Sequence, residues 1–200
     1  MTEHVHRDDF GARLGMWLFL VTEMLLFGGL FIAYSYMRAR YPVEFHHGGA
    51  ELNAVLGVTN TLVLLTSSLT VVLSIVAIQR GEKARSMLLL AATVCLGLVF
   101  LVIKSFEWGA KFHHGLYPGA KHLATLPPGE QVFFGLYFTM TGLHGVHVLV
   151  GMGVLGYILW MMKQDEVRAD RYIHLENGGL YWHLVDVIWI FLLPLFYLAA

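Results

Sequence analysis

Charge, cysteine and internal repetition are all scarce in this sequence. Asp, Glu, Lys and Arg make up 14% of the 200 residues and the formal net charge is -1 at pH 7, so neither a nucleic acid nor a strongly charged soluble partner is expected. The single Cys95 excludes an internal disulfide and is predicted to be a buried thiol within an apolar run. No repeat or domain boundary is visible, and residues 1–200 are interpreted as a single transmembrane domain.

Apolar residues are abundant instead, at 57% of the chain. A bilayer core of about 30 Å needs about 20 apolar residues in a helix, because lipid tolerates only internally hydrogen-bonded backbone. Five stretches meet this requirement, near residues 14–37, 54–78, 87–108, 132–162 and 178–198. The connecting segments, residues 38–53, 79–86, 109–131 and 163–177, are predicted to be polar loops. The fold class is therefore predicted to be all-α, a polytopic five-helix transmembrane bundle.

The distribution of Lys and Arg predicts an N-terminus in the cytoplasm and a C-terminus outside, because cytoplasmic loops carry an excess of positive charge. In that orientation the cytoplasmic cations are Arg7, Arg13, Arg80, Lys83, Arg85, Lys163, Arg168 and Arg171, and the outer ones are Arg38, Arg40, Lys111 and Lys121. Residues 1–13 are short and polar, so no removable signal peptide is expected and the first helix is predicted to be its own insertion signal.

Small and polar residues at regular spacing predict how the helices pack. In the fourth stretch, one face carries a stripe of glycines where a neighbouring helix is expected to approach closely. These glycines are Gly135, Gly142, Gly145, Gly153 and Gly156. In the second stretch, Asn60, Ser67 and Ser74 recur every seven residues and are interpreted as polar contacts between helices. In the fifth, a polar and aromatic seam occupies one face and comprises Trp182, His183, Asp186, Trp189 and Tyr197.

Ionisable side chains at membrane depth are costly unless they are paired, neutral or near water, so each is a candidate functional residue. Five stand out, namely Glu23, His144, His147, His183 and Asp186. Asp186 is predicted to be offset by a histidine or indole donor. Glu23 has no cation near it in the sequence. A hydrogen-bond network without any chemistry is the alternative interpretation of all five.

Two further groups of polar residues are predicted to be less important. Lys104, Glu107 and Lys111 share one helix face and are expected to form an ion-paired patch at the outer membrane interface. Seven surface histidines are scattered over loops without carboxylates or thiols at ligand spacing, so no metal site is expected. They are His4, His6, His46, His47, His113, His114 and His122.

Four segments together resemble a known family. Residues 176–192, ENGGLYWHLVDVIWIFL, closely resemble the last helix of subunit III of haem-copper oxidases. Residues 141–151, TGLHGVHVLVG, are similar to its penultimate helix, and residues 22–27, TEMLLF, to its glutamate-bearing helix. Residues 106–108, FEW, resemble another helix of the same subunit. The resemblance spans nearly the whole chain, and two helices of the seven-helix form are missing, as in the short bacterial form.

The resemblance implies a non-catalytic subunit of a cytochrome c oxidase in a bacterial inner membrane, beside subunits I and II. The haems and copper would lie in those partners, and this chain would support proton uptake and protect the enzyme during turnover. Glu23 matches the carbodiimide-sensitive glutamate of the family, whose reactivity requires a protonated carboxyl in an apolar setting. The wider intramembrane polar network would comprise His144, His147, His183, Asp186, Glu107 and Glu176.

The resemblance also implies bound phospholipid, in a cleft between the first two helices and the remaining three. Cationic side chains at the cleft mouths would hold the phosphates. On the inner side, the candidates are Arg80, Lys83 and Arg85.

Several alternatives remain at this point. Related short subunits occur in ubiquinol oxidases, and a related protein accompanies nitric oxide reductases. A proton-coupled transporter could use Glu23 and Asp186 as carriers, although repeats and broken helices are absent. A membrane cytochrome b could hold haem between His144, His147 and His183. Two haems and a copper would take about six histidines over several helices, more than this chain has at membrane depth. The electron donor, cytochrome c or quinol, would bind to other subunits.

Overall fold

The computed structural model describes residues 9–198, and the predictions that concern Arg7, His4 and His6 lie outside this range. Five helices in it are long and apolar enough to cross a membrane. They are α1 (Asp9–Arg40), α3 (Ala54–Gln79), α4 (Lys83–His113), α5 (Pro128–Lys163) and α6 (Ile173–Leu193), the last continued by the π-helical turn η2 (Pro194–Leu198). Each lies over one of the predicted stretches, so the predicted all-α bundle with five spans is confirmed.

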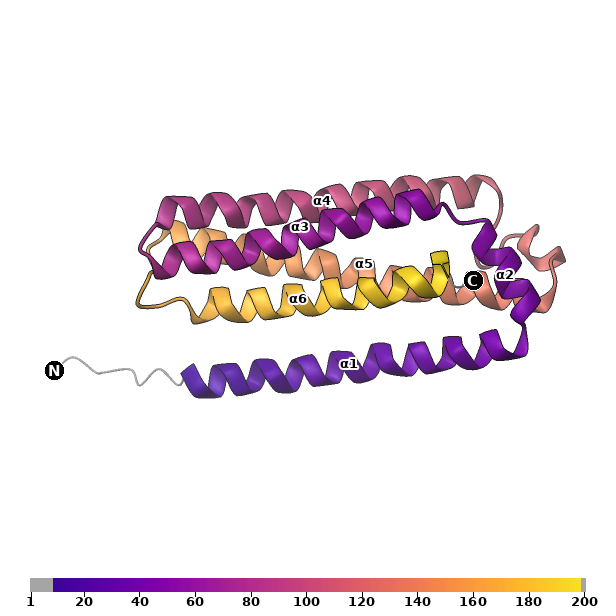
Figure 1. Ribbon diagram of the computed structural model, residues 1–200, viewed down its shortest axis with the longest axis horizontal. Coiled ribbons are helices and arrows are strands. Elements are labelled where there is room, and N and C mark those ends of the chain that lie inside the picture. Colours follow the sequence, from indigo (N-terminus) through magenta and orange to yellow (C-terminus); the bar gives the residue numbers. More distant parts are fainter. Residues whose placement is uncertain (1–8, 199–200) are drawn as a thin grey trace.

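The helices are arranged as a group of four with one helix at its side (Figure 1). Helix α3 packs along α4 and also contacts α6, while α5 contacts both α4 and α6. Helix α1 lies along α6 and touches α5, and its contact with α3 is slight or absent. The predicted division into the first two spans and the last three is therefore wrong: α1 stands apart, and the second span belongs to the four-helix group.

Two predicted loops contain helical structure. Residues 42–50 form the short helix α2 (Pro42–Ala50), which begins with a proline, a residue whose fixed φ suits the first helical position. Its Phe45 is fully buried and packs edge-on against Phe133 of α5, with ring centroids 5.4 Å apart. Residues 109–131 contain the end of α4 and the 3-10 turn η1 (Leu123–Thr125). These segments were predicted to be loops because each helical element is short and offers only a short run of apolar residues.

Both ends of α3 are closed by local hydrogen bonds, and the second end forms the turn into α4. The side chain of Asn53 accepts hydrogen bonds from the backbone N–H groups of Val55 and Leu56, which satisfies donors at the start of α3. At the other end, Gly81 has a φ of +77°, which is unfavourable for residues with a Cβ atom. The N–H of Glu82 then reaches back to the carbonyl of Ala77 and closes the helix end.

Four of the five glycines in the predicted stripe of α5 have open space within the described residues. A Cβ atom added at Gly135, Gly145, Gly153 or Gly156 would meet no other atom within 4 Å, whereas one added at Gly142 would lie 3.1 Å from the ring of Trp108 in α4. Closer approaches occur at Gly97 of α4 and Gly151 of α5, where an added Cβ would stand 2.7 Å and 2.9 Å from the ring of Trp182. Periodicity shows which residues share a face but not which face turns inward. Cys95 shows the same error, since its predicted burial is wrong and it lies exposed on α4.

The polar residues of α3 do join helices. Ser67 accepts a hydrogen bond from the indole of Trp182 at 3.0 Å, and the hydroxyls of Ser74 and Ser86 pair at 3.0 Å between α3 and α4. Asn60 is fully buried, and its side-chain amide forms no hydrogen bond within residues 9–198. Two of the three predicted interhelical contacts are therefore present.

Candidate functional site

Glu23 of α1 and His147 of α5 form a pair where α1 contacts the group of four helices. The Glu23 Oε2 atom lies 2.8 Å from the His147 Nε2 atom. Their side chains are 15% and 14% exposed, and the ring of Phe27 stands edge-on to the imidazole at 5.3 Å. No cation lies near Glu23 along the sequence, and in the structure its partner is a residue 124 positions away.

The geometry places one proton in this pair. The His147 Nδ1 atom lies 2.8 Å from the carbonyl oxygen of Leu143, which can only accept, so Nδ1 carries a hydrogen. If the imidazole is neutral, Nε2 is a bare acceptor and the carboxyl of Glu23 must donate. If Nε2 is also protonated, the partner is a carboxylate. The same proton can therefore sit on either residue, as expected of a group that gives up and takes back a proton.

Asp186 is not paired as predicted. It lies on α6 with 3% of its surface exposed, and neither of its oxygens accepts a well-aligned hydrogen bond from residues 9–198. Three residues earlier on α6, the Nδ1 atom of His183 lies 2.6 Å from the hydroxyl of Ser68 on α3. The predicted histidine or indole donor to Asp186 is therefore absent from the described residues.

His144 occupies a closed aromatic setting. Its ring is fully buried, packs against Trp189 at 5.2 Å and stands edge-on to Phe100 at 5.5 Å. Neither ring nitrogen has a hydrogen-bond partner in the described range. The three intramembrane histidines thus have three separate environments, and no three His, Cys, Asp or Glu side chains of residues 9–198 are grouped to hold a metal ion.

Lys104 and Glu107 form the predicted ion pair, and it is buried between helices. Their side chains are only 7% and 3% exposed, with 3.1 Å between Lys104 Nζ and Glu107 Oε2. The hydroxyls of Tyr137 and Tyr197 donate to Glu107 Oε1 at 2.8 Å and 2.6 Å. The ammonium also hydrogen-bonds both hydroxyls, at 3.0 Å and 2.5 Å. Lys111, the third predicted member, instead donates to the backbone carbonyl of Glu51. Helical spacing found the pair but could not find the tyrosines from other elements.

The cations predicted to hold lipid are mostly engaged with carboxylates. Lys83 lies 2.6 Å from Asp165, and Arg85 lies 3.0 Å from Glu82. The hydrogen bond and positive charge of Lys83 hold the pKa of Asp165 below its ordinary value. Arg80 is exposed at the same end of α3. These contacts offset positive charge that a phosphate would otherwise meet.

Glu176 lies at the start of α6 and is bound by Arg13 of α1. The Arg13 guanidinium donates to Glu176 Oε2 at 2.7 Å. The side chain of Asn177 also donates to the backbone carbonyl of Ala12, at 3.3 Å. These contacts fasten the first turns of α1 to the first turns of α6, so Glu176 belongs to the helix end and not to the central network.

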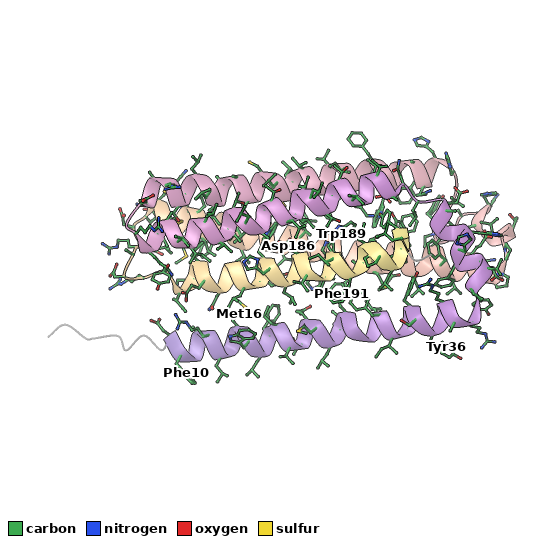
Figure 2. All side chains as sticks on the ribbon, in the orientation of Figure 1. Phe10, Met16, Tyr36, Asp186, Trp189 and Phe191 are labelled. Carbon is green, nitrogen blue, oxygen red and sulfur yellow. The ribbon has the colours of Figure 1, made fainter. Side chains whose placement is uncertain are left out.

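An apolar groove runs between α1 and α6. It is lined from α1 by residues that include Trp17, Met24 and Phe27, and from α6 by residues that include His183 and Phe191. Figure 2 shows Phe191 on the side of α6 that faces α1. A smaller hollow adjoins the groove, and Trp17 and His183 line both. The lining of the smaller hollow also includes Arg13 and Glu176. The groove takes the place of the cleft that was predicted between two groups of helices.

Comparison with known proteins decides the family. The family described as Cytochrome c oxidase subunit III matches residues 1–200. The chain belongs to this family. It is a multi-pass membrane protein and subunit III of a haem-copper oxidase, a family whose metal cofactors lie in other subunits. The transporter and cytochrome b alternatives are thereby set aside.

Relatives in three kinds of oxidase support this placement. Cytochrome c oxidase subunit 3 of Thermostichus vulcanus is 30% identical over 99% of this chain and 92% of its own length. Cytochrome bo(3) ubiquinol oxidase subunit 3 of Pseudomonas aeruginosa is 31% identical over 99% and 90%. Heme-copper oxidase subunit I+III of Aeropyrum pernix is 27% identical over 94% of this chain and 22% of its own length. In that relative, a subunit III is part of the same polypeptide as a subunit I.

Proposed function

We propose that this subunit III is the non-catalytic subunit of a bacterial cytochrome c oxidase, held in the inner membrane beside subunits I and II with its N-terminus in the cytoplasm. The observation that carries the proposal is the Glu23–His147 pair, a carboxyl group and an imidazole 2.8 Å apart inside the membrane-spanning helices. Ubiquinol oxidase is the second candidate complex, supported by the Pseudomonas aeruginosa relative. The nitric oxide reductase accessory role rests on the sequence resemblance alone.

Within that complex, the pair supports proton uptake by the catalytic subunit and keeps it active through many turnovers. Glu23 and His147 bridge α1 and α5, and the hydroxyl of Tyr181 on α6 donates to the backbone carbonyl of His147 at 3.2 Å. Moving the shared proton changes the charge on both partners at once, so the contact between α1 and the other helices responds to protonation. A functional carboxylate at position 23 therefore need not touch a haem or copper.

Phospholipid is proposed to bind along the α1–α6 groove. Its lining is apolar side chains, which suit an acyl chain, and Arg13 lies in the hollow that adjoins it. A guanidinium at that position can bind a phosphate oxygen in addition to Glu176. Arg80, Lys83 and Arg85 remain proposed phosphate ligands on the α3–α4 side. Loss of retained phospholipid from a complex with Arg13→Ala, but not with Arg85→Ala, would support the groove over the α3–α4 side.

The test of the proposed function is Glu23→Gln in the whole complex, with the exposed Glu166→Gln as a matched control. The Gln amide keeps the shape but removes the exchangeable carboxyl proton. We expect the initial rate of oxygen consumption to be largely unchanged, whereas proton release per electron falls or activity decays sooner over many turnovers. Immediate loss of all activity with intact subunit composition would show that the chain is not accessory. If Glu23→Gln and Glu166→Gln behave identically over many turnovers, Glu23 has no role in proton uptake or in the stability of turnover.

A further inference from the structure

The Arg13–Glu176 ion pair stands at the inner end of the α1–α6 groove. Both residues line the smaller hollow, which shares Trp17 and His183 with the groove. Trp17 is 57% exposed, and tryptophan prefers the level of the lipid headgroups. From Trp17 the groove continues to Phe31, which is about 21 Å along α1 at a rise of 1.5 Å per residue. A charged end with a long apolar body beside it matches a single membrane lipid lying along α1.

Each member of the ion pair has hydrogen-bonding capacity left. The Arg13 guanidinium donates to Glu176 through Nη2, while its Nε and Nη1 atoms donate to no group within residues 9–198. On the carboxylate, Oε2 is the acceptor, and Oε1 accepts no hydrogen bond from the same range. The two side chains are 55% and 24% exposed, so a headgroup can reach both. The pair therefore presents donors for an anion beside an acceptor for a cation.

Carboxylates outnumber guanidiniums around this pair. A polar hollow next to it is lined by Asp9, Asp170 and Arg171 as well as by Arg13 and Glu176. The guanidinium of Arg171 lies 3.9 Å from Asp170, so its charge is partly offset by that carboxylate. A lipid with only negative charge, such as phosphatidylglycerol, would therefore meet a surplus of carboxylates. A lipid that also carries an ammonium group would find a partner for each of its charges.

We propose that the α1–α6 groove selects phosphatidylethanolamine over phosphatidylglycerol, with Arg13 binding the phosphate and Glu176 binding the ammonium group. The proposal rests on the proposed lipid site and adds which headgroup that site prefers. In the bound state the charges alternate in the order phosphate, guanidinium, carboxylate and ammonium, so each charge neighbours one of opposite sign. The N–H groups of ethanolamine can donate to Glu176 Oε1, whereas the glycerol headgroup brings no positive charge.

The test counts the lipids that stay with the purified complex after equilibration with detergent micelles that contain equal amounts of the two lipids. Native mass spectrometry gives the number of each lipid per complex. The variant Gly28→Trp identifies the groove lipid by subtraction, because Gly28 lines the groove and a Cβ added there meets no atom within 4 Å. Glu176→Gln keeps the shape of the side chain and removes its charge. The exposed Glu166→Gln is the matched control.

We expect the groove of the unmodified complex, and of Glu166→Gln, to hold phosphatidylethanolamine about fivefold more often than phosphatidylglycerol, the upper range for a partly exposed ion pair. In Glu176→Gln this preference should disappear, because Arg13 then binds either phosphate equally well. The same preference in Glu176→Gln and in the unmodified complex would overturn the selectivity and leave the lipid site intact. If Gly28→Trp displaces no lipid, the lipid site itself is wrong, and the proposed preference is overturned with it.

Discussion

The buried cluster of Lys104, Glu107, Tyr137 and Tyr197 allows a quantitative prediction. In Glu107→Leu, the Lys104 ammonium remains buried without its counter-charge, and such a change typically costs about 3–5 kcal/mol. The two tyrosine hydroxyls also lose an acceptor, at about 1 kcal/mol each. The hydrogen bonds that the ammonium donates to both hydroxyls are retained. We therefore expect Glu107→Leu to destabilise the subunit by about 4 kcal/mol.

Removing both charges should be milder than removing one. In the double variant Lys104→Met with Glu107→Leu, no unpaired charge is buried, and replacing a buried ion pair by apolar residues is often neutral or stabilising. The double variant should therefore be at least about 2 kcal/mol more stable than Glu107→Leu alone. The assay is an SDS titration of the purified complex that records the midpoint at which this chain is released. A double variant that is released as early as the single variant, or earlier, would refute the reasoning.

Three other predictions concern orientation, packing and surface charge. A cysteine at Arg168 should not react with a membrane-impermeant thiol reagent added from the periplasm, and labelling from that side would reverse the proposed topology. Gly151→Leu should destabilise the subunit by about 1–3 kcal/mol, because its side chain meets an indole ring, and the chain should be released at a lower SDS midpoint. Gly153→Leu, with open space around it, should leave the midpoint unchanged. Since Lys83 lowers the pKa of Asp165, their pair contributes above the ordinary aspartate pKa of about 3.9 and is lost as pH falls through the folded value. Lys83→Ala and the unmodified complex should thus have melting curves that differ slightly at neutral pH and coincide in acid.

The sequence predicted those features that depend on residues close together along the chain. Apolar length predicted five spans, and the three-residue spacing of Lys104 and Glu107 predicted their ion pair, because both features lie within a single helix. The depth of Glu23 and His147 was also readable, since depth follows from position along a helix. The polar seam of α6 was correctly assigned to one face, as the contacts of Trp182 and Tyr197 show.

The remaining features depend on how helices are rotated and placed, and periodicity does not contain that information. Four glycines of the α5 stripe meet no neighbouring helix within the described residues, because periodicity defines a face without saying what covers it. The partner of Glu23 comes from a helix more than a hundred residues away, and the partner of His183 is Ser68 in α3. The position of α1 beside α6 also depends on distant contacts, such as that between Arg13 and Glu176.

This chain is proposed to work beside a catalytic subunit that holds the haems and copper. The most direct measurement is mass spectrometry and visible spectroscopy of the complex purified through this chain from its native membrane in mild detergent. We predict co-purification of a haem-copper subunit I and a copper-binding subunit II, with a Soret band that disappears when this chain is separated from them. Purification of the chain alone, or a Soret band that stays with the separated chain, would contradict the account.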